Sequence, residues 1–423
     1  MSRAPKLERF NNEVASKYQI YNGIFMTLPF DKIANTGGLL PLFYQLCVSG
    51  YEKSKNPTEI VNYFFERYMR DATLEERNTM LFKFIQYIER QVVLFDAIED
   101  AAFGQVNNLD GRGSLRSIKD EAQALNKSQE LDAYLKELKV RPVLTAHPTQ
   151  FYPGAVLHII NDLGKAVQEN DIQQVKSLLA QLGKTPFFKK VKPTPYDEAV
   201  SLILYLENIF YYTMGSIYDY VKSSMDHPEE FTNEIVELGF WPGGDRDGNP
   251  FVTTQITLDV AQKLRSRLFR NYYWGLKELR RRLTFDGVED ALAKLTTQCH
   301  KAIDTKGELP FSLEEFKKEL QTIRETLVDK HDGLFVNLLD SFINKVTLFG
   351  FHFATLDIRQ DSSAHDAVFN HVATSLPEQF PANYNDLPET EKIALLTNAS
   401  GNLKPEDYND DFTQRTLSSI YAM

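Results

Sequence analysis

The sequence is poor in cysteine, in excess positive charge and in long apolar runs. Its 423 residues include two cysteines, Cys47 and Cys299, whose spacing fits neither a disulfide framework nor a zinc site and suits a reducing compartment. The 58 acidic side chains outnumber the 47 basic ones, whereas nucleic-acid-binding proteins normally carry an excess of Lys and Arg. The longest apolar stretches, 23–29 and 39–48, are shorter than the roughly 20 residues that cross a bilayer.

The first residues of the chain also lack the apolar segment of a signal peptide. Residues 1–8 read MSRAPKLE and are followed at once by charged sequence. We therefore expect a cytoplasmic protein that has neither a membrane nor a nucleic acid as its partner. The net charge of -11 still leaves room for a local basic site that binds an anionic metabolite.

Most of the chain shows the apolar spacing of amphipathic helices, with apolar residues three and four positions apart. Helix start signals, in which a capping residue is followed three positions later by Glu, stand at Asn56, Thr73 and Ser312. Further helical stretches are expected at 114–139, 155–182, 196–225, 255–283, 312–329 and 334–347.

Three short segments interrupt this helical spacing. They are rich in β-branched, aromatic or apolar residues and lie at 140–145, 238–241 and 350–358. Strands separated by long helical stretches predict parallel strands joined by helical crossovers. Polar clusters follow the segments at 146–150, 243–250 and 359–361. Because the carboxyl ends of parallel strands meet on one side, the sequence predicts a mainly α-helical α/β fold whose site lies at these ends.

The first polar cluster contains His147, which is followed by Pro148. Proline fixes its own φ and favours an extended conformation for the residue before it, so His147 stands in a stiff backbone. A histidine titrates near neutral pH and can accept a proton or donate one to a phosphate. A structural histidine that bonds a neighbouring carbonyl is an equally reasonable interpretation.

The second cluster, 243–250, consists only of Gly, Asp, Arg, Asn and Pro. Its glycines allow a sharp turn and a close approach to a ligand. Arg246 carries a planar cation that suits phosphate or carboxylate, and the flanking Asp245 and Asp247 could orient it. A tight turn with a surface ion pair is the usual alternative for such a loop, but the density of these residue types favours a binding site.

The third cluster follows an apolar strand that contains Asp357. An unpaired buried carboxylate is costly, so this side chain needs a partner. Arg359 lies two residues further on and therefore on the same face of the strand. A structural pair between Asp357 and Arg359 is the more favoured interpretation, and a role for Arg359 in substrate binding is the alternative.

Together these segments resemble one family. The segment 143–149 is similar to the sequence around the active-site histidine of bacterial- and plant-type phosphoenolpyruvate carboxylases. The loop 240–250 resembles that family's Gly-Gly-Asp-Arg-Asp-Gly-Asn-Pro loop, and 356–360 resembles its Leu-Asp-Ile-Arg-Gln segment. A further stretch, 192–199, is also similar, and the order and rough spacing agree from about residue 140 to 365.

The resemblance implies a mostly helical protein around an eight-stranded (β/α)8-type barrel. We expect an N-terminal helical region at 1–139 and the first part of the barrel domain, with helical insertions, at 140–423. Three strands cannot close a barrel, and the helical pattern at 411–423 has no stop signal. We therefore expect a chain truncated at its C-terminus, the N-terminal part of such an enzyme, which is inactive alone.

The resemblance also implies the chemistry. Bicarbonate is added to phosphoenolpyruvate to give oxaloacetate and phosphate, an anaplerotic carbon fixation that feeds the tricarboxylic acid cycle. The cofactor would be Mg²⁺ or Mn²⁺, with its ligands beyond residue 423, and the full-length protein a homo-tetramer. His147 would act at the carboxyphosphate stage and Arg246 on the transferring phosphoryl group, where positive charge is needed. Asp245, Arg246 and Arg359 would bind substrate.

The chain departs from the family's pattern at several positions. Gln150 stands where the family usually has Glu, Thr355 stands where many members have Arg, and residues 152–155 replace basic residues. These differences concern fine positioning and regulation. Two other functions remain open: a non-catalytic binding or assembly fragment that partners a complete subunit, and a different phosphate-binding barrel enzyme that shares the loops.

Overall fold

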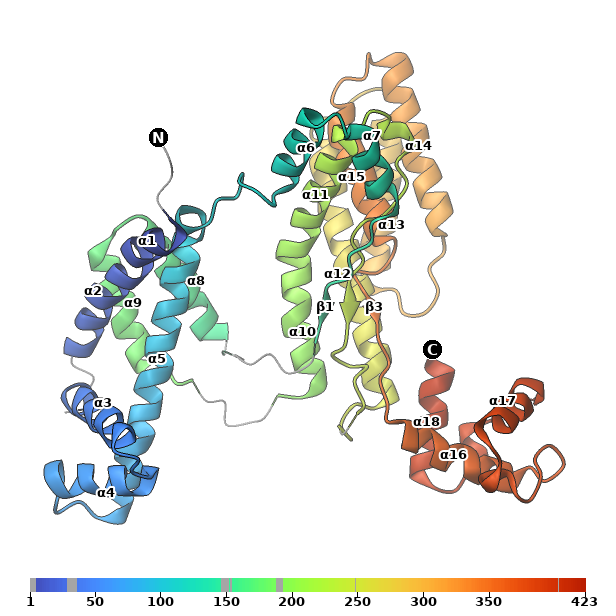
Figure 1. The fold of residues 1–423 in the computed structure, drawn as a ribbon. Coiled ribbons are helices and arrows are strands. Elements are labelled where there is room, and N and C mark those ends of the chain that lie inside the picture. Colours follow the sequence, from blue (N-terminus) through green and yellow to red (C-terminus); the bar gives the residue numbers. More distant parts are fainter. Residues whose placement is uncertain are drawn as a thin grey trace. The chain divides into compact units, whose positions relative to one another are not determined.

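The computed structural model describes residues 5–28, 36–145, 152, 154–187, 193–247, 249–401 and 403–423 (Figure 1). The chain forms two compact units, each described by itself below. Unit 1 comprises Met1–Ser117 and Gln150–Lys192, and unit 2 comprises Ile118–Thr149 and Pro193–Met423. These units divide the chain at other points than residue 139, and the domain boundary expected there stays a prediction.

Unit 1 is helical in its described residues, and the long helix α5 (Leu74–Val106) lies at its centre. Apolar residues of α5 pack mainly against α8 (Gly154–Gln168), which in turn packs against α9 (Ile172–Lys184). The other elements are α1 (Lys6–Phe10), the π-helix η1 (Asn11–Ala15), α2 (Ser16–Thr27), α3 (Thr36–Glu52) and α4 (Pro57–Tyr68).

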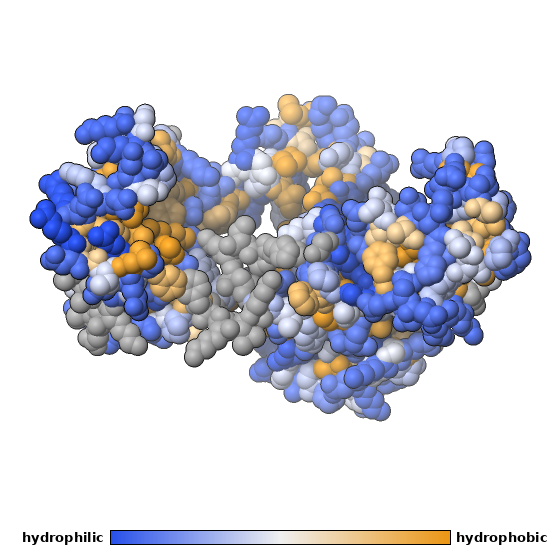
Figure 2. Space-filling model, turned by 90° about the horizontal axis from the view of Figure 1, so that it is seen from below, coloured by the Kyte–Doolittle hydropathy of each residue, from blue (hydrophilic) through white to orange (hydrophobic). Residues whose placement is uncertain are grey.

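On the face shown in Figure 2, the coloured residues are mostly hydrophilic, and smaller apolar areas lie among them. On α5 the exposed apolar side chains include Ile85 and Ile88, which lie three residues apart on one side of the helix. Phe82 and Val92 are also exposed and continue this row at spacings of three and four residues. Among the described residues, no helix has both the length and the apolar character to span a membrane.

Unit 2 contains most of the helices and all the strands of the described residues. Its α-helices between residues 195 and 349 are α10 (Pro195–Tyr205), α11 (Tyr211–Ser224), α12 (Thr254–Arg280), α13 (Glu289–Asp304), α14 (Leu313–Lys330) and α15 (Val336–Phe349). The others are α6 (Leu115–Ala124), which begins in unit 1, α7 (Ser128–Glu137), η2 (Leu206–Phe210), η3 (Pro228–Glu230), α16 (Ser362–Ser375), η4 (Tyr384–Asp386), α17 (Glu389–Asn398), η5 (Pro405–Asp407) and α18 (Asp411–Ala422).

The helix start signals found in the sequence are confirmed. Capping boxes open α4, α5 and α14, with Asn56, Thr73 and Ser312 as the capping residues. Each cap satisfies backbone N–H groups that have no partner within the helix. The segment that resembles the family at 192–199 contains a similar box, because Thr194 caps α10 and Asp197 bonds the Thr194 N–H at 2.9 Å. In its described residues this motif therefore begins a helix.

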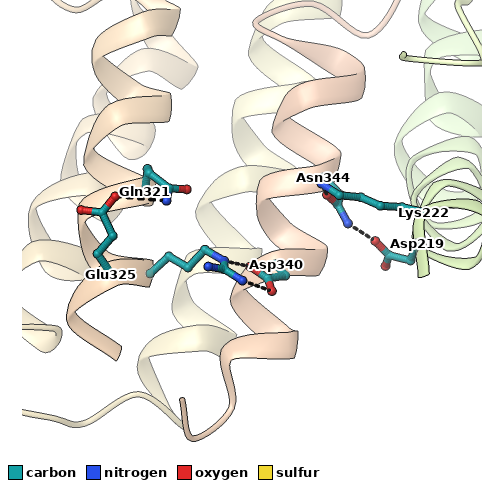
Figure 3. Close-up of polar contacts among 7 residues, drawn as sticks. Asp219, Lys222, Gln321, Glu325, Asp340 and Asn344 are labelled. Atoms are coloured by element: carbon teal, nitrogen blue, oxygen red, sulfur yellow. Dashed lines mark hydrogen bonds and ion pairs between the residues drawn. The ribbon is translucent and has the colours of Figure 1, made fainter. Parts of the chain in front are cut away.

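Polar contacts also join the helices of unit 2 (Figure 3). Between α11 and α15, Ser341 and Asn344 donate to the two oxygens of Asp219 at 2.6 and 2.7 Å, and Lys222 donates to Asn344 at 3.2 Å. Because these groups are partly buried, satisfied hydrogen bonds favour one alignment of the two helices over others. A two-pronged contact from Arg324 to Asp340, at 2.6 and 3.2 Å, joins α14 to α15.

The sheet of the described residues has three short parallel strands, in the order β1-β2-β3. They are β1 (Val143–Leu144), β2 (Gly239–Phe240) and β3 (Thr355–Leu356). The prediction of parallel, adjacent strands in these segments is confirmed, but the strands are shorter than expected. Residues 350–354 form turns and bends after α15. Isolated bridges lengthen the pairing at Val140–Val236 and at Asp245–Arg359.

The two faces of this sheet differ in character. Leu144, Phe240 and Leu356 are paired across the strands and belong to the apolar core that α12, α13, α14 and α15 build with them. On the other face, Val143, Gly239 and Thr355 form the neighbouring row, in which Val143 and Thr355 are exposed. Successive side chains of a strand point to opposite faces, so the sheet has one apolar face and one open face. The mainly helical α/β class is confirmed.

Candidate functional site

The loops that follow β2 and β3 meet at the carboxyl ends of these strands. The Arg246 N–H donates to the Arg359 carbonyl, and the Arg359 N–H donates to the Gly244 carbonyl, both at 2.9 Å. The structure thus brings together two of the three polar clusters that the sequence placed at strand ends. The third cluster, with His147, lies outside the described residues, so its place in this site stays a prediction.

Two glycines allow the loop after β2 to lie this close to its neighbours. Gly243 has a φ of +85°, and a Cβ there would stand 2.6 Å from Val260 of α12. A Cβ on Gly244 would collide with the backbone carbonyl of Asp357. The sequence suggested that these glycines let the backbone approach a ligand, whereas the close approach seen here is to α12 and to the chain after β3. Only glycine combines a positive φ with so little space.

Arg359 is held by two residues of the β2 loop. Its Nη1 lies 3.3 Å from Oδ2 of Asp245, and its guanidinium carbon lies 4.0 Å from the centre of the Trp241 ring. A guanidinium over an indole ring is a favourable cation–π contact. The second oxygen of Asp245, Oδ1, is buried and has no hydrogen-bond partner among the described residues. Asp245, which was expected to orient Arg246, therefore pairs with Arg359.

The predicted pair between Asp357 and Arg359 is wrong. Asp357 instead accepts a hydrogen bond from Arg141, whose Nη2 lies 2.6 Å from its Oδ1. These residues adjoin β1 and β3, which are not neighbours in the sheet, and they meet above Gly239 of the intervening strand. A Cβ on Gly239 would lie 3.1 Å from Asp357 Oδ2 and 3.2 Å from Arg141 Nε. The missing side chain of Gly239 makes room for this ion pair.

Arg246 is buried, with 8% of its surface exposed. Its Nη1 donates to the carbonyl of Arg415 in α18 at 3.2 Å, and none of the described residues forms an ion pair with it. Burial, and to a smaller extent the charge of Arg415, lower the pKa of Arg246. Arginine nevertheless stays charged, because its ordinary pKa is far above neutrality. The site therefore holds a buried cation without a carboxylate partner among the described residues.

A cavity of about 330 Å³ adjoins Arg246. Its walls come from the β2 loop, from the start of α16 and from α18, and include Asn249, Gln360, Arg415 and Thr416. No sequence pattern singled out Arg415, because it lies in an amphipathic helix outside every motif. Arg141 was missed for a similar reason: its partner is 216 positions away in the chain, and no spacing rule connects them.

The acidic residues near the site do not fit a divalent metal ion. Such ions take clustered carboxylates and other oxygen ligands, but Asp245 and Asp357 are each paired with an arginine. In the part of the chain that the structure describes, no three His, Cys, Asp or Glu side chains are grouped so that they could hold a metal. The expectation that metal ligands lie beyond residue 423 stays a prediction.

Comparison with known proteins identifies related sequences over most of the chain. The family model described as "Phosphoenolpyruvate carboxylase" matches residues 80–309 and 290–418. A protein named phosphoenolpyruvate carboxylase from Gloeobacter violaceus is 25% identical to this chain over 69% of its length. One from Aeromonas hydrophila is 27% identical over 72% of the chain. One from Nitrosomonas eutropha is 27% identical over 68% of the chain.

The matched regions cover 38%, 40% and 36% of these three relatives. The chain thus spans about two fifths of the length of the curated relatives it matches. The family match covers more than half of the chain and includes β1, β2, β3 and the loops that follow β2 and β3. The chain belongs to the phosphoenolpyruvate carboxylase family.

Proposed function

We propose that this chain carries part of the active site of an enzyme that adds bicarbonate to phosphoenolpyruvate, giving oxaloacetate and phosphate. The observation that carries the proposal is the meeting of Arg246 and Arg359 at the carboxyl ends of β2 and β3. Both residues lie in segments that resemble the family's motifs. Each guanidinium suits a phosphate or carboxylate group, and phosphoenolpyruvate carries both groups.

The strands β1, β2 and β3 are proposed to be part of a (β/α)8-type barrel. Their parallel order and the long helical connections between them support this. The row of Val143, Gly239 and Thr355 would face the barrel interior, while Leu144, Phe240 and Leu356 face the surrounding helices. Val143 of this row is 38% exposed, which agrees with a position on the open face of the sheet.

Each site residue has a proposed role that follows from its chemistry. Arg246 would stabilise the negative charge that grows on the phosphoryl group during transfer to bicarbonate. Arg359, fixed by Asp245 and Trp241, would hold an anionic group of the substrate without losing side-chain entropy on binding. His147 would act at the carboxyphosphate stage as a proton donor or acceptor. The acidic residues described here hold arginines, so no step is assigned to a metal.

The 423-residue chain alone is proposed to be inactive. Arg246 and Arg359 supply only part of the positive charge that surrounds phosphoenolpyruvate, and the nearby carboxylates are already paired. A purified chain given phosphoenolpyruvate, bicarbonate and Mg²⁺ or Mn²⁺ should produce no oxaloacetate in a coupled assay. Turnover that disappears in the His147→Asn variant, which excludes a contaminant, would show this proposal to be wrong.

The complete gene product provides the test of the reaction itself. It should form oxaloacetate in the same coupled assay, and His147→Asn should nearly abolish this activity without changing the melting temperature. Arg246→Lys should lower the rate at least about a hundredfold, because lysine cannot reproduce a planar, two-pronged grip. Near-normal rates in these variants would refute the assigned roles, and no oxaloacetate from the unmodified product would refute the function.

The oligomeric state is proposed from the same family membership. The full-length enzyme would be a homo-tetramer. Sedimentation velocity on the complete gene product should then give the mass of four chains. A monomer at micromolar concentration would contradict this.

A further inference from the structure

The buried guanidinium of Arg246 has unused hydrogen-bonding capacity. An arginine carries five N–H donors, and one of them, on Nη1, reaches a described acceptor, the Arg415 carbonyl at 3.2 Å. Leaving a buried charged group without compensating bonds is costly. Its remaining nitrogens are not among the fully buried atoms without partners, and Arg246 lines the cavity described above. Among the described residues these remaining N–H groups have no acceptor, and the residue that carries them lines the cavity.

Arg415 brings a second guanidinium to the same cavity. Its Nη2 donates to the Pro250 carbonyl at 2.6 Å. This bond fixes the Arg415 side chain, and with it α18, against the loop 243–250. Its Nη1 lies 3.5 Å from Asp411, whose carboxylate is 82% exposed. An ion pair this exposed is weakened by water and salt. Two positive charges thus line one cavity, and the single acidic residue in its walls faces mainly solvent.

The other walls of the cavity are partly apolar, because Pro250, Val252, Ala364 and Phe412 lie among the polar lining residues. Asn249, Gln360 and Thr416 contribute amide and hydroxyl groups, which can donate to an oxyanion. The volume of about 330 Å³ lies at the lower end of the roughly 300–1,000 Å³ range of small-molecule sites. The space is therefore sufficient for one small phosphorylated acid.

We propose that this cavity is an oxyanion-binding site for a phosphate monoester, and that Arg415 binds the anion together with Arg246. The inference rests on the proposed function, because it adds the residue Arg415 to the site at which Arg246 is proposed to contact the phosphoryl group. In this proposal α18 forms one wall of the site next to the ligand's charged group. The Pro250 carbonyl holds the Arg415 side chain in place.

A purely structural role for Arg415 is the alternative. In that case its guanidinium serves only to hold α18 against Pro250. Removing the guanidinium would then lower the stability of the protein, and the folded protein would bind the anion with unchanged affinity. A measurement of binding, with stability measured in parallel, distinguishes the two roles. The exposed Arg281, which pairs with Glu278 at 3.2 Å in the same unit, provides a matched control.

Isothermal titration of the 423-residue chain with inorganic phosphate, and then with phosphoenolpyruvate, is the test. Arg415→Gln should weaken the binding of both at least about tenfold, since it removes charge-assisted hydrogen bonds. Arg415→Lys should lose less, and Arg281→Gln should bind as the unchanged chain does. No binding by the unchanged chain, or equal binding by Arg415→Gln, would overturn the inference.

A second measurement needs no variant and covers the case in which Arg415→Gln unfolds. Phosphate should protect Arg415 from modification by phenylglyoxal, detected by peptide mass, and should leave Arg281 unprotected. Equal modification of Arg415 with and without phosphate would also overturn the inference. Failure of these tests leaves the proposed carboxylation untouched if the complete gene product still forms oxaloacetate and Arg246→Lys still abolishes that activity.

Discussion

The two faces of the three-stranded sheet are built on different principles. On one face, Leu144, Phe240 and Leu356 join a single apolar core, in which Phe240 is fully buried. On the other face, above Gly239, Arg141 reaches Asp357 from the far strand. The first face is stabilised by close packing, which is not directional. The second depends on charges that must meet at defined distances.

The difference shows where this protein can hold a site. A polar face next to an apolar one allows charged groups to be positioned by a rigid support. At the carboxyl ends of the strands the balance of charge also changes. Arg141 and Arg359 have carboxylate partners, whereas Arg246 has none among the described residues. An unbalanced, buried cation is a candidate binding group, while a balanced pair is more often structural.

The largest effect is expected on the apolar face. Phe240→Ala should destabilise unit 2 by about 3–5 kcal/mol, because it removes a fully buried ring and leaves a cavity. Both tryptophans, Trp241 and Trp274, lie in unit 2, so urea unfolding followed by tryptophan fluorescence reports on this unit. A loss below about 1 kcal/mol would mean that the apolar face does not carry the stability of the sheet.

The close approach of the β2 loop is expected to be the next most sensitive feature. Gly244→Ala should cost about 3 kcal/mol, since its new methyl group would meet the rigid backbone carbonyl of Asp357. Gly239→Ala is the matched comparison: its methyl group would meet the flexible ends of Val143, Asp357 and Arg141 at 3.0 to 3.2 Å. The same unfolding experiment should show a smaller loss there. Equal losses would remove the distinction between backbone and side-chain contacts.

The ion pair across Gly239 should contribute less than either packing feature. The Arg141 and Asp357 side chains are 42% and 27% exposed, so a coupling of about 0.5–1 kcal/mol is expected. A double-mutant cycle with Arg141→Gln and Asp357→Asn measures this coupling, which should fall when NaCl is raised to 1 M. A coupling above 2 kcal/mol, insensitive to salt, would show that the pair is effectively buried.

The smallest effect is expected at Thr355, on the open face. Its hydroxyl donates to Glu237 at 3.1 Å, but the side chain is exposed and water can replace this bond. Thr355→Val should therefore change the free energy of unfolding by no more than about 0.5 kcal/mol. A larger loss would mean that the open face contributes more to stability than its exposure suggests.

The sequence predicted the secondary structure of this protein better than its contacts. Helix starts at Asn56, Thr73 and Ser312 depend on residues three positions apart, and local rules describe such interactions well. The strand predicted at 350–358 was too long, because the apolar alternation there continues through a turn after α15. An apolar pattern marks burial, and turns can be buried as well as strands.

The site was predicted in part. The adjacency of the clusters at Arg246 and Arg359 followed from parallel strands, because their carboxyl ends must meet on one side. The ion-pair partners of the charged side chains could not be predicted from the parallel arrangement of the strands. The sequence paired Asp357 with Arg359, two residues away on the same strand face. In the structure each has a partner from another strand or loop, where cross-strand neighbours lie closer.

Short-range spacing and residue type are sufficient to predict the helical character, the three strands and the loops that carry the family's motifs. Which charges are paired depends on how the elements pack. The tertiary structure places Arg141 beside Asp357 across 216 positions, and it brings Arg415 of α18 to Arg246 across 169. Contacts over such separations depend on how helices and strands pack, and no periodicity in the chain encodes them. The absence of a carboxylate partner for Arg246 among the described residues, and with it the cavity proposed to bind an anion, results from that packing.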